Sequence, residues 1–137
     1  MPKSQQVELR LTADLDPPGE GTQRRYTLYL PLYNGVDRLE IGVPTGTRFM
    51  PEAPRREKPL VFYGTSIMHG ACASRPGMSI TGILGRRLNR PVINLGFSGN
   101  GRMESEVGAL LVELDAAVYV VDCLPNMRGA EVRQRAA

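Results

Sequence analysis

Three short segments of the sequence contain the residue types that acyl transfer requires. Acyl transfer needs a hydroxyl nucleophile together with N–H donors that stabilise the developing oxyanion. Ser66 can supply the hydroxyl, and the backbone N–H groups of Ser66 and Gly99 and the side-chain amide of Asn126 can supply three donors. A glycine at position 99 also allows the backbone to approach a substrate closely. The three residues together therefore predict a site for acyl transfer.

Each of these residues also has a purely structural interpretation. A serine that follows a strand often caps a helix or lies in a turn. Gly99 can serve only to provide a positive φ in a turn, and Asn126 can cap a following helix. The order of the three residues, each placed directly after its own predicted strand, favours the functional interpretation.

Three short apolar runs precede these segments and predict strands. They are residues 60–63, 91–95 and 117–121. Between them, apolar residues recur at helical spacing over 78–88 and over 103–114. A βαβαβ unit with right-handed crossovers folds as a parallel sheet, here with the strand order 2-1-3. Ligands of such a sheet bind beyond the carboxyl ends of the strands, which is where the three segments begin.

The N-terminal part of the chain has the period of antiparallel strands instead. Apolar residues alternate over 7–11, over 26–33 and over 36–43. Asn34-Gly35 separates the last two runs and favours the type I′ turn of a β-hairpin. A linker over 44–59 follows and holds four of the eleven prolines. The predicted fold class is therefore α/β, with a small antiparallel β unit followed by the βαβαβ first half of a flavodoxin-like parallel sheet.

Composition and charge argue against several other functions. The chain has 137 residues, of which 42% are hydrophobic and 23% charged, as is typical of one globular domain. No run of about 18 apolar residues predicts a membrane span. The formal charge is +3, and the basic residues form scattered pairs rather than the stripe of a nucleic-acid interface. We therefore expect neither a nucleic-acid partner nor a membrane span.

The few side chains that could bind a metal argue against a metal site. Cys72 and Cys123 have no zinc-ligand spacing, and His69 is the one histidine, so no metal or other cofactor is expected. The two cysteines read as free thiols, with a disulfide between them as the less favoured alternative. The first ten residues are polar and show no signal peptide, which predicts a cytoplasmic protein as the chain stands, or a secreted one if the true N-terminus is missing.

In their order, the three segments resemble the SGNH (GDSL-like) serine esterases and lipases. Four sequence blocks mark this family, and they carry a serine, a glycine, an asparagine and finally Asp-x-x-His. Gly64-Thr-Ser66-Ile resembles the first block, Asn94-Leu-Gly-Phe-Ser-Gly99-Asn the second, and Asp122-Cys-Leu-Pro-Asn126-Met the third. The stretch Tyr29–Val43 resembles the end of the GxDLY domain that precedes the catalytic domain in one subgroup.

The resemblance implies an activity, a domain division and a role for each residue. Ser66 would be the catalytic nucleophile, and Gly99 and Asn126 would form the oxyanion hole. Residues 1–52 would be part of the β-rich N-terminal domain, and residues 53–137 the N-terminal portion of the SGNH hydrolase domain. The expected substrate is a small-molecule or acylated-carbohydrate ester, hydrolysed without metal or cofactor. Acyl and alcohol specificity and oligomeric state are not predicted.

This sequence departs from the family pattern in three places. Thr65 stands where the family name has aspartate, and Pro125 and Met127 flank the asparagine in place of the usual Gly-x-Asn-Asp. No Asp-x-x-His block is found in the 137 residues. The chain therefore reads as an incomplete piece of a longer esterase that lacks the catalytic His and Asp. The alternative is a non-catalytic remnant of the same fold that binds carbohydrate or protein.

Other sources of chemistry in the same loops are less favoured. His69 follows Ser66 by three residues and is within reach as a base, but nothing in the sequence fixes the orientation of its ring. An α/β-hydrolase nucleophile elbow is excluded because Met68 takes the position of the second glycine. A Rossmann fingerprint is excluded because residues 96–101 read Gly-x-x-Gly-x-Gly after the second strand.

Overall fold

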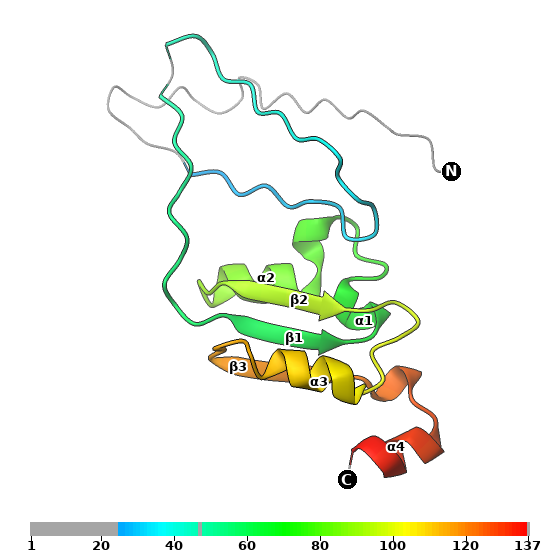
Figure 1. Cartoon of the computed structure of the whole chain (residues 1–137). Coiled ribbons are helices and arrows are strands. Elements are labelled where there is room, and N and C mark those ends of the chain that lie inside the picture. Colours follow the sequence, from blue (N-terminus) through cyan, green and yellow to red (C-terminus); the bar gives the residue numbers. More distant parts are fainter. Residues whose placement is uncertain (1–24, 47, 137) are drawn as a thin grey trace.

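A three-stranded parallel sheet lies at the centre of the computed structural model, which describes residues 25–46 and 48–136 (Figure 1). Its strand order is β2-β1-β3, which confirms the predicted order. The elements, in chain order, are β1 (Leu60–Gly64), α1 (Ser66–His69), a 3₁₀ turn (Pro76–Met78), α2 (Ile80–Arg87), β2 (Val92–Gly96), α3 (Ser105–Leu111), β3 (Val118–Asp122), a second 3₁₀ turn (Leu124–Asn126) and α4 (Gly129–Arg135).

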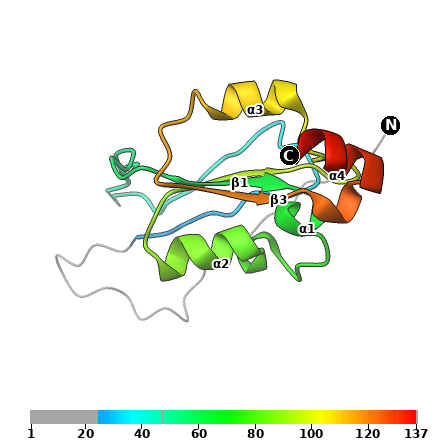
Figure 2. The same cartoon turned by 90° about the horizontal axis from the view of Figure 1, so that it is seen from below.

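Helices lie on both faces of the sheet. Figure 2 shows α3 on one face and α1 and α2 on the other, while α4 lies beyond the end of the strands. The central strand β1 is buried along its whole length, as expected for a parallel strand that is covered on both faces. Among the described residues, no helix is long and apolar enough to cross a membrane.

The core of the described chain is centred on the face that α1 and α2 cover. Leu60 and Phe62 of β1 pack there with Met68 of α1, and all three are buried. The partly buried side chains that surround this cluster come from the neighbouring elements and are Leu84, Val92 and Val120. Because side chains alternate along a strand, Val61 and Tyr63 point to the opposite face, toward α3.

A buried polar cluster joins β2 to the helices on the same face as the core. The Asn94 side chain donates to the Thr81 hydroxyl at 3.0 Å and to the His69 carbonyl at 3.3 Å, and it accepts from the Gly96 N–H at 2.9 Å. Ser79, which caps α2, bonds Thr81 at 3.1 Å. These hydrogen bonds fix the end of β2 against α1 and compensate the cost of burying polar groups.

The predicted helices are present, but each is shorter than its apolar pattern. The pattern over 78–88 becomes α2, which begins after Ser79 because that side chain accepts from the N–H of Gly82. The pattern over 103–114 becomes α3, because Met103 has a φ of +55° and cannot belong to a helix. Leu110, which the pattern places on the apolar face, is 63% exposed. Helices α1 and α4 are additional to the predicted elements.

The predicted small antiparallel β unit is not shown. Residues 25–46 contain no strand, and Asn34-Gly35 lies in an irregular bend. A two-stranded hairpin is marginal without an apolar face to pack on, and most of the alternating side chains here are exposed, with Tyr26 at 60% and Leu28 at 51%. Pro31 also removes one backbone donor from the first run. The alternation over 7–11 lies outside the described residues.

Candidate active site

The register of the sheet brings the ends of its three strands to one level. Gly64 at the end of β1 pairs with Gly96 of β2 on one side and with Asp122 of β3 on the other. Backbone hydrogen bonds continue this alignment, from Phe97 N–H to the Gly64 carbonyl at 2.8 Å and from Thr65 N–H to the Asp122 carbonyl at 3.1 Å. The three loops that carry the predicted site residues therefore leave the sheet side by side.

Ser66 is the first residue of α1 and is half-buried. The preceding residue, Thr65, caps this helix, because its buried hydroxyl accepts from the Ile67 N–H at 3.3 Å. Within the part of the chain that the structure describes, the Ser66 hydroxyl makes no hydrogen bond. The capping role considered for Ser66 therefore belongs to Thr65, and the Ser66 hydroxyl is left for other chemistry.

Gly99 lies at the exposed tip of the loop that follows β2. Its φ of +75° belongs to the left-handed region, and nothing lies within 4 Å of the position that a Cβ would take. Gly101, in the same loop, has a φ of +69° and sits so close to the end of β1 that a Cβ would lie 2.1 Å from the Gly64 carbonyl oxygen. The loop therefore packs closely against the end of β1 at Gly101, whereas Gly99 has free space beside it.

Asn126 ends the 3₁₀ turn that follows β3. Its side chain contacts the loop between β2 and α3, residues 97–104, which we call the glycine loop. Its side-chain Nδ2 donates to the Asn100 carbonyl, next to Gly99. Helix α4 begins three residues later, after Arg128, so Asn126 does not cap it. An asparagine amide has two N–H groups, and the contact with Asn100 uses one of them. The structure thus brings Asn126 and the loop of Gly99 together, and the second N–H of the Asn126 amide has no partner among the described residues.

The His69 ring contacts the N-terminal segment rather than the Ser66 hydroxyl. Its Nε2 bonds the Leu32 carbonyl, and its ring stacks on Tyr33 with 4.1 Å between the ring centroids. A carbonyl only accepts, so this contact places the proton on Nε2 and leaves Nδ1 as the acceptor in the neutral ring. Nδ1 is buried and has no partner among the described residues. The structure therefore gives His69 a role in joining α1 to the N-terminal segment, and it does not bring the ring to the Ser66 hydroxyl.

Sequence reasoning missed a polar pair below the glycine loop. Tyr63 of β1 is 3% exposed, and its hydroxyl donates to Oε2 of Glu104, which also accepts from the Arg102 N–H at 2.8 Å. Burial raises the pKa of Tyr63 further above its usual range, and the bond to Glu104 adds to this rise. Burial alone would raise the pKa of Glu104, but the hydrogen bonds from Tyr63 and Arg102 outweigh it and lower this pKa. In the sequence, Tyr63 appeared only as a member of an apolar strand.

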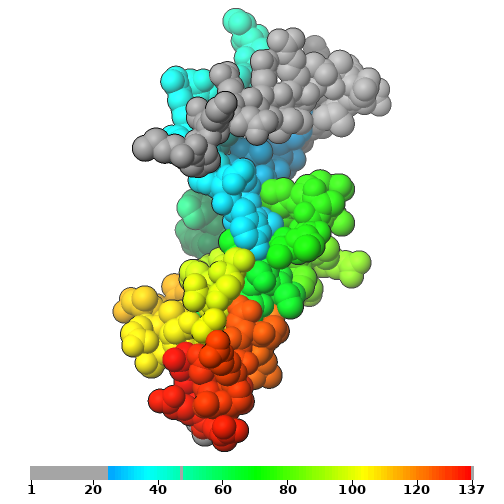
Figure 3. Space-filling model, turned by 90° about the vertical axis from the view of Figure 1, so that its right-hand side faces the viewer, coloured from blue at the N-terminus to red at the C-terminus, as the bar shows by residue number. Residues whose placement is uncertain are grey.

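A network of charged side chains joins the same loop to the C-terminal helix. Arg135 of α4 donates to the Arg102 carbonyl at 2.9 Å, and Glu131 lies 3.8 Å from Arg102 and 4.0 Å from Arg135. Figure 3 shows the yellow residues around 100 in contact with the orange and red residues of the C-terminal part. Helix α4 therefore contacts this loop at Arg102.

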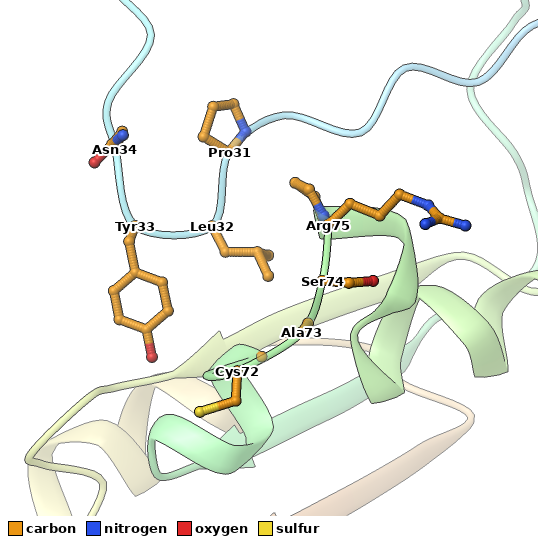
Figure 4. A pocket seen from close by; sticks show the side chains of 10 residues that line it. Pro31, Leu32, Tyr33, Asn34, Cys72, Ala73, Ser74 and Arg75 are labelled. Carbon is orange, nitrogen blue, oxygen red and sulfur yellow. The ribbon is translucent and has the colours of Figure 1, made fainter.

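A shallow groove of about 300 Å³ lies beside α1. The N-terminal segment forms one wall with residues 31–34, and the loop that follows α1 forms the other with residues 72–76. Figure 4 shows Leu32 and Tyr33 extending from the first wall toward Cys72 and Ala73 in the second. The groove thus adjoins the helix that begins at Ser66.

The cysteines and the acidic residues form no second site in the described chain. Cys72 is exposed and Cys123 is buried, and both are free thiols. Burial raises the pKa of Cys123, which makes its thiolate less available. Within residues 25–46 and 48–136, no group of three or more His, Cys, Asp or Glu side chains is placed to hold a metal ion.

Comparisons with known proteins show the family of the chain. The sequence model of the GDSL-like Lipase/Acylhydrolase family matches residues 57–137, and that of the GxDLY N-terminus of SGNH-type esterases matches residues 3–49. No curated protein matches the chain. One solved structure, described as a GDSL-like lipase from Bacteroides ovatus ATCC 8483, superposes with a TM-score of 0.74 at 42% sequence identity.

The solved structure is much longer than this chain. The match covers 79% of the present chain and 32% of the Bacteroides ovatus chain, so the present chain spans about a third of that length. The family resemblance that was drawn from the serine, glycine and asparagine segments is confirmed by all three matches. With its central parallel sheet and these matches over both of its parts, the chain belongs to the GDSL-like lipase/acylhydrolase family.

Proposed function

We propose that the protein is a serine esterase that hydrolyses carboxylic esters through an acyl-enzyme on Ser66. The observation that carries this proposal is the register of the sheet, which pairs Gly64 with Gly96 and with Asp122. Because the three strands end together, the loops of Ser66, Gly99 and Asn126 leave the sheet at the same edge. Membership of a hydrolase family supports the reaction class. The Ser66 hydroxyl and the second N–H of Asn126, which have no partner among the described residues, support the assignment of roles.

The reaction proceeds in two halves. The Ser66 Oγ attacks the ester carbonyl carbon, its proton passes to a general base, and the carbonyl oxygen becomes an oxyanion. The N–H groups of Ser66, Gly99 and Asn126 stabilise this charge. Collapse of the intermediate breaks the bond to the alcohol oxygen, which takes the proton from the base, and leaves the acyl group on Ser66. Water, activated by the same base, then attacks the acyl-enzyme and releases the acid.

The general base is proposed to lie outside these 137 residues. His69, the one histidine of the sequence, is bonded to Leu32 and stacked on Tyr33 rather than directed at Ser66. The family resemblance implies an Asp-x-x-His block in this role. A serine hydroxyl without a base is a weak nucleophile, although an oxyanion hole alone still retains some rate over water. The 137-residue chain by itself is therefore expected to be weakly active or inactive.

The groove beside α1 is proposed to admit the alcohol part of the substrate. It is formed by the N-terminal segment and by the loop after α1, so both proposed domains, residues 1–52 and 53–137, contribute to it. The separate family matches over 3–49 and 57–137 support this division. A groove wall contributed by the proposed N-terminal domain, residues 1–52, suits a small-molecule ester or an acylated carbohydrate.

Replacing Asn126 by aspartate tests the oxyanion hole. This change keeps the size of the side chain but removes its N–H donors and adds a negative charge near the developing oxyanion. The test uses the intact protein, by which we mean the longer protein that also carries the proposed general base. We expect its kcat for p-nitrophenyl acetate to fall by at least about 10²- to 10³-fold, which is the usual effect of losing one such donor. KM should change little, because the donor acts mainly on the transition state.

A matched exchange at Asn89 separates this effect from the mere loss of an amide. Asn89 lies at the other end of β2, after α2, and its side-chain oxygen accepts from Arg55. Asn89→Asp keeps an acceptor for Arg55 and should leave kcat within about twofold. If kcat of Asn126→Asp also stays within about twofold of the wild-type value, Asn126 is not part of the oxyanion hole. If the intact protein shows no hydrolysis at all, the alternative of a carbohydrate- or protein-binding protein is favoured.

A further inference from the structure

The loop that carries Gly99 contacts one buried side chain at both of its ends. At its start, Phe97 packs edge-on against the ring of Tyr63, with 6.1 Å between the ring centroids. At its end, Glu104 receives the Tyr63 hydroxyl hydrogen bond and returns one from its own N–H at 3.4 Å. Tyr63 itself is held in the central strand one residue before Gly64. A single rigid position in the sheet therefore contacts both ends of the loop.

The second half of this loop needs such support because one of its residues, Met103, has a strained backbone conformation. Gly99, Gly101 and Met103 all have positive φ, and Met103 has a side chain that disfavours this region. Glu104 compensates for this locally, since its Oε2 accepts from both Tyr63 and the Arg102 N–H. The Arg102 side chain in turn donates to the Gly99 carbonyl at 3.4 Å. A chain of contacts thus runs from Tyr63 through Glu104 and Arg102 to Gly99.

We infer that Tyr63 and Glu104 are positioning residues that fix the Gly99 N–H for the oxyanion. This inference rests on the proposed esterase function. Neither side chain is proposed to contact the substrate, because Tyr63 is buried on the α3 face of the sheet and Glu104 is bonded to it. Their effect is to hold the backbone on both sides of the Gly99 N–H, at Phe97 before it and at the Gly99 carbonyl after it, before the substrate arrives. Preorganisation of this kind matters because small misplacements of an N–H donor reduce its benefit in the transition state.

Tyr63→Phe is the most direct test, because it removes the hydroxyl and keeps the ring against Phe97. We expect kcat in the intact protein to fall by about ten- to a hundredfold, with KM within about twofold, since a donor is displaced rather than removed. Hydrogen exchange at the amides of residues 97–101 should become about fivefold faster, as expected when one hydrogen bond is lost. A merely structural role would lower stability without this split between kcat and KM.

Two variants at Glu104 provide a rescue comparison. Glu104→Gln keeps an oxygen that can accept from both Tyr63 and Arg102, so kcat and loop exchange should stay within about threefold of wild type. Glu104→Ala removes the acceptor and should reproduce the Tyr63→Phe phenotype. Tyr119→Phe is the matched control, because the hydroxyl of Tyr119, on the neighbouring strand β3, donates to the Leu114 carbonyl in the turn after α3 and has no contact with the loop in the described structure. It should leave both readouts unchanged.

The two readouts keep this inference separate from the proposed function. Exchange is measured without substrate, whereas hydrolysis is compared with that of Ser66→Ala. Unchanged loop exchange in Tyr63→Phe would overturn the inference, and so would faster exchange with unchanged kcat. Hydrolysis that persists in Ser66→Ala would instead contradict the proposed nucleophile, and the exchange data would still show whether Tyr63 fixes the loop.

Discussion

Ser66→Ala is expected to abolish ester hydrolysis by the intact protein without affecting its stability. Removal of the nucleophile from a serine hydrolase lowers kcat by about 10⁶-fold, and we expect a loss of at least about 10⁴-fold here. The free energy of unfolding should change by less than about 0.5 kcal/mol, because Thr65 rather than Ser66 caps α1. Initial rates with p-nitrophenyl acetate and a urea unfolding curve measure the two quantities.

Ser105→Ala provides the matched control for this prediction. Ser105 is also the first residue of a helix, and its hydroxyl is exposed and bonded only to the neighbouring Glu106, at 3.2 Å. Because it has the same local position but faces no predicted donor, its loss should leave kcat within about twofold. Equal rates for the Ser66→Ala variant and the wild type would show that the observed hydrolysis does not depend on Ser66.

Gly101→Ala is expected to destabilise the protein by about 3–5 kcal/mol. The added methyl would lie 2.1 Å from the carbonyl oxygen of Gly64, which is backbone at the end of the buried central strand and cannot move aside. The left-handed φ of +69° adds a conformational penalty of about 1–2 kcal/mol. Overpacking against fixed backbone accounts for the remainder. Chemical denaturation monitored by circular dichroism measures the loss.

Gly99→Ala in the same loop separates the two contributions. Its φ of +75° is similar, but nothing lies within 4 Å of the added methyl. Only the conformational penalty applies, and the expected loss is about 1–2 kcal/mol. Similar losses in the two variants would mean that Gly101 is not packed against Gly64 in solution, and the attachment of the loop to β1 would then have to be revised.

The parallel sheet could be predicted because its signals are local and mutually consistent. Each strand is a short apolar run, and the residues that follow two of them are glycines at which the chain turns. The register sets Gly64 beside Gly96 and Asp122, so that the three strands end together. The positions of Ser66, Gly99 and Asn126 at one edge follow from that register.

Other features could not be predicted because they depend on tertiary contacts. The alternation over 26–43 is typical of a hairpin, but most of its apolar side chains are exposed in the described chain, and no strand forms. The pairing of Tyr63 with Glu104 joins residues 41 positions apart, and neither residue has a local signal. The orientation of His69 depends on Leu32 and Tyr33 of the N-terminal segment. In each case, partners distant in the sequence determine the conformation.

The structure also argues against the capping interpretation for two of the three predicted site residues. Thr65 takes the cap of α1, and α4 begins after Arg128, so neither Ser66 nor Asn126 is used as a helix cap. Gly99 does provide a positive φ, and this conformation is compatible with its proposed role as a donor. The structural interpretations of Ser66 and Asn126 therefore lose their support, which favours the proposed esterase site.

Covalent trapping of the nucleophile tests the central claim most directly. A fluorophosphonate transfers its phosphonyl group to an activated serine with loss of fluoride, and mass spectrometry of the digested protein locates the adduct. In the intact protein, we predict one adduct on the peptide that contains Ser66, and none in Ser66→Ala. An intact protein that hydrolyses esters but carries its adduct on another residue, or carries none, would contradict the assignment of Ser66 as the nucleophile.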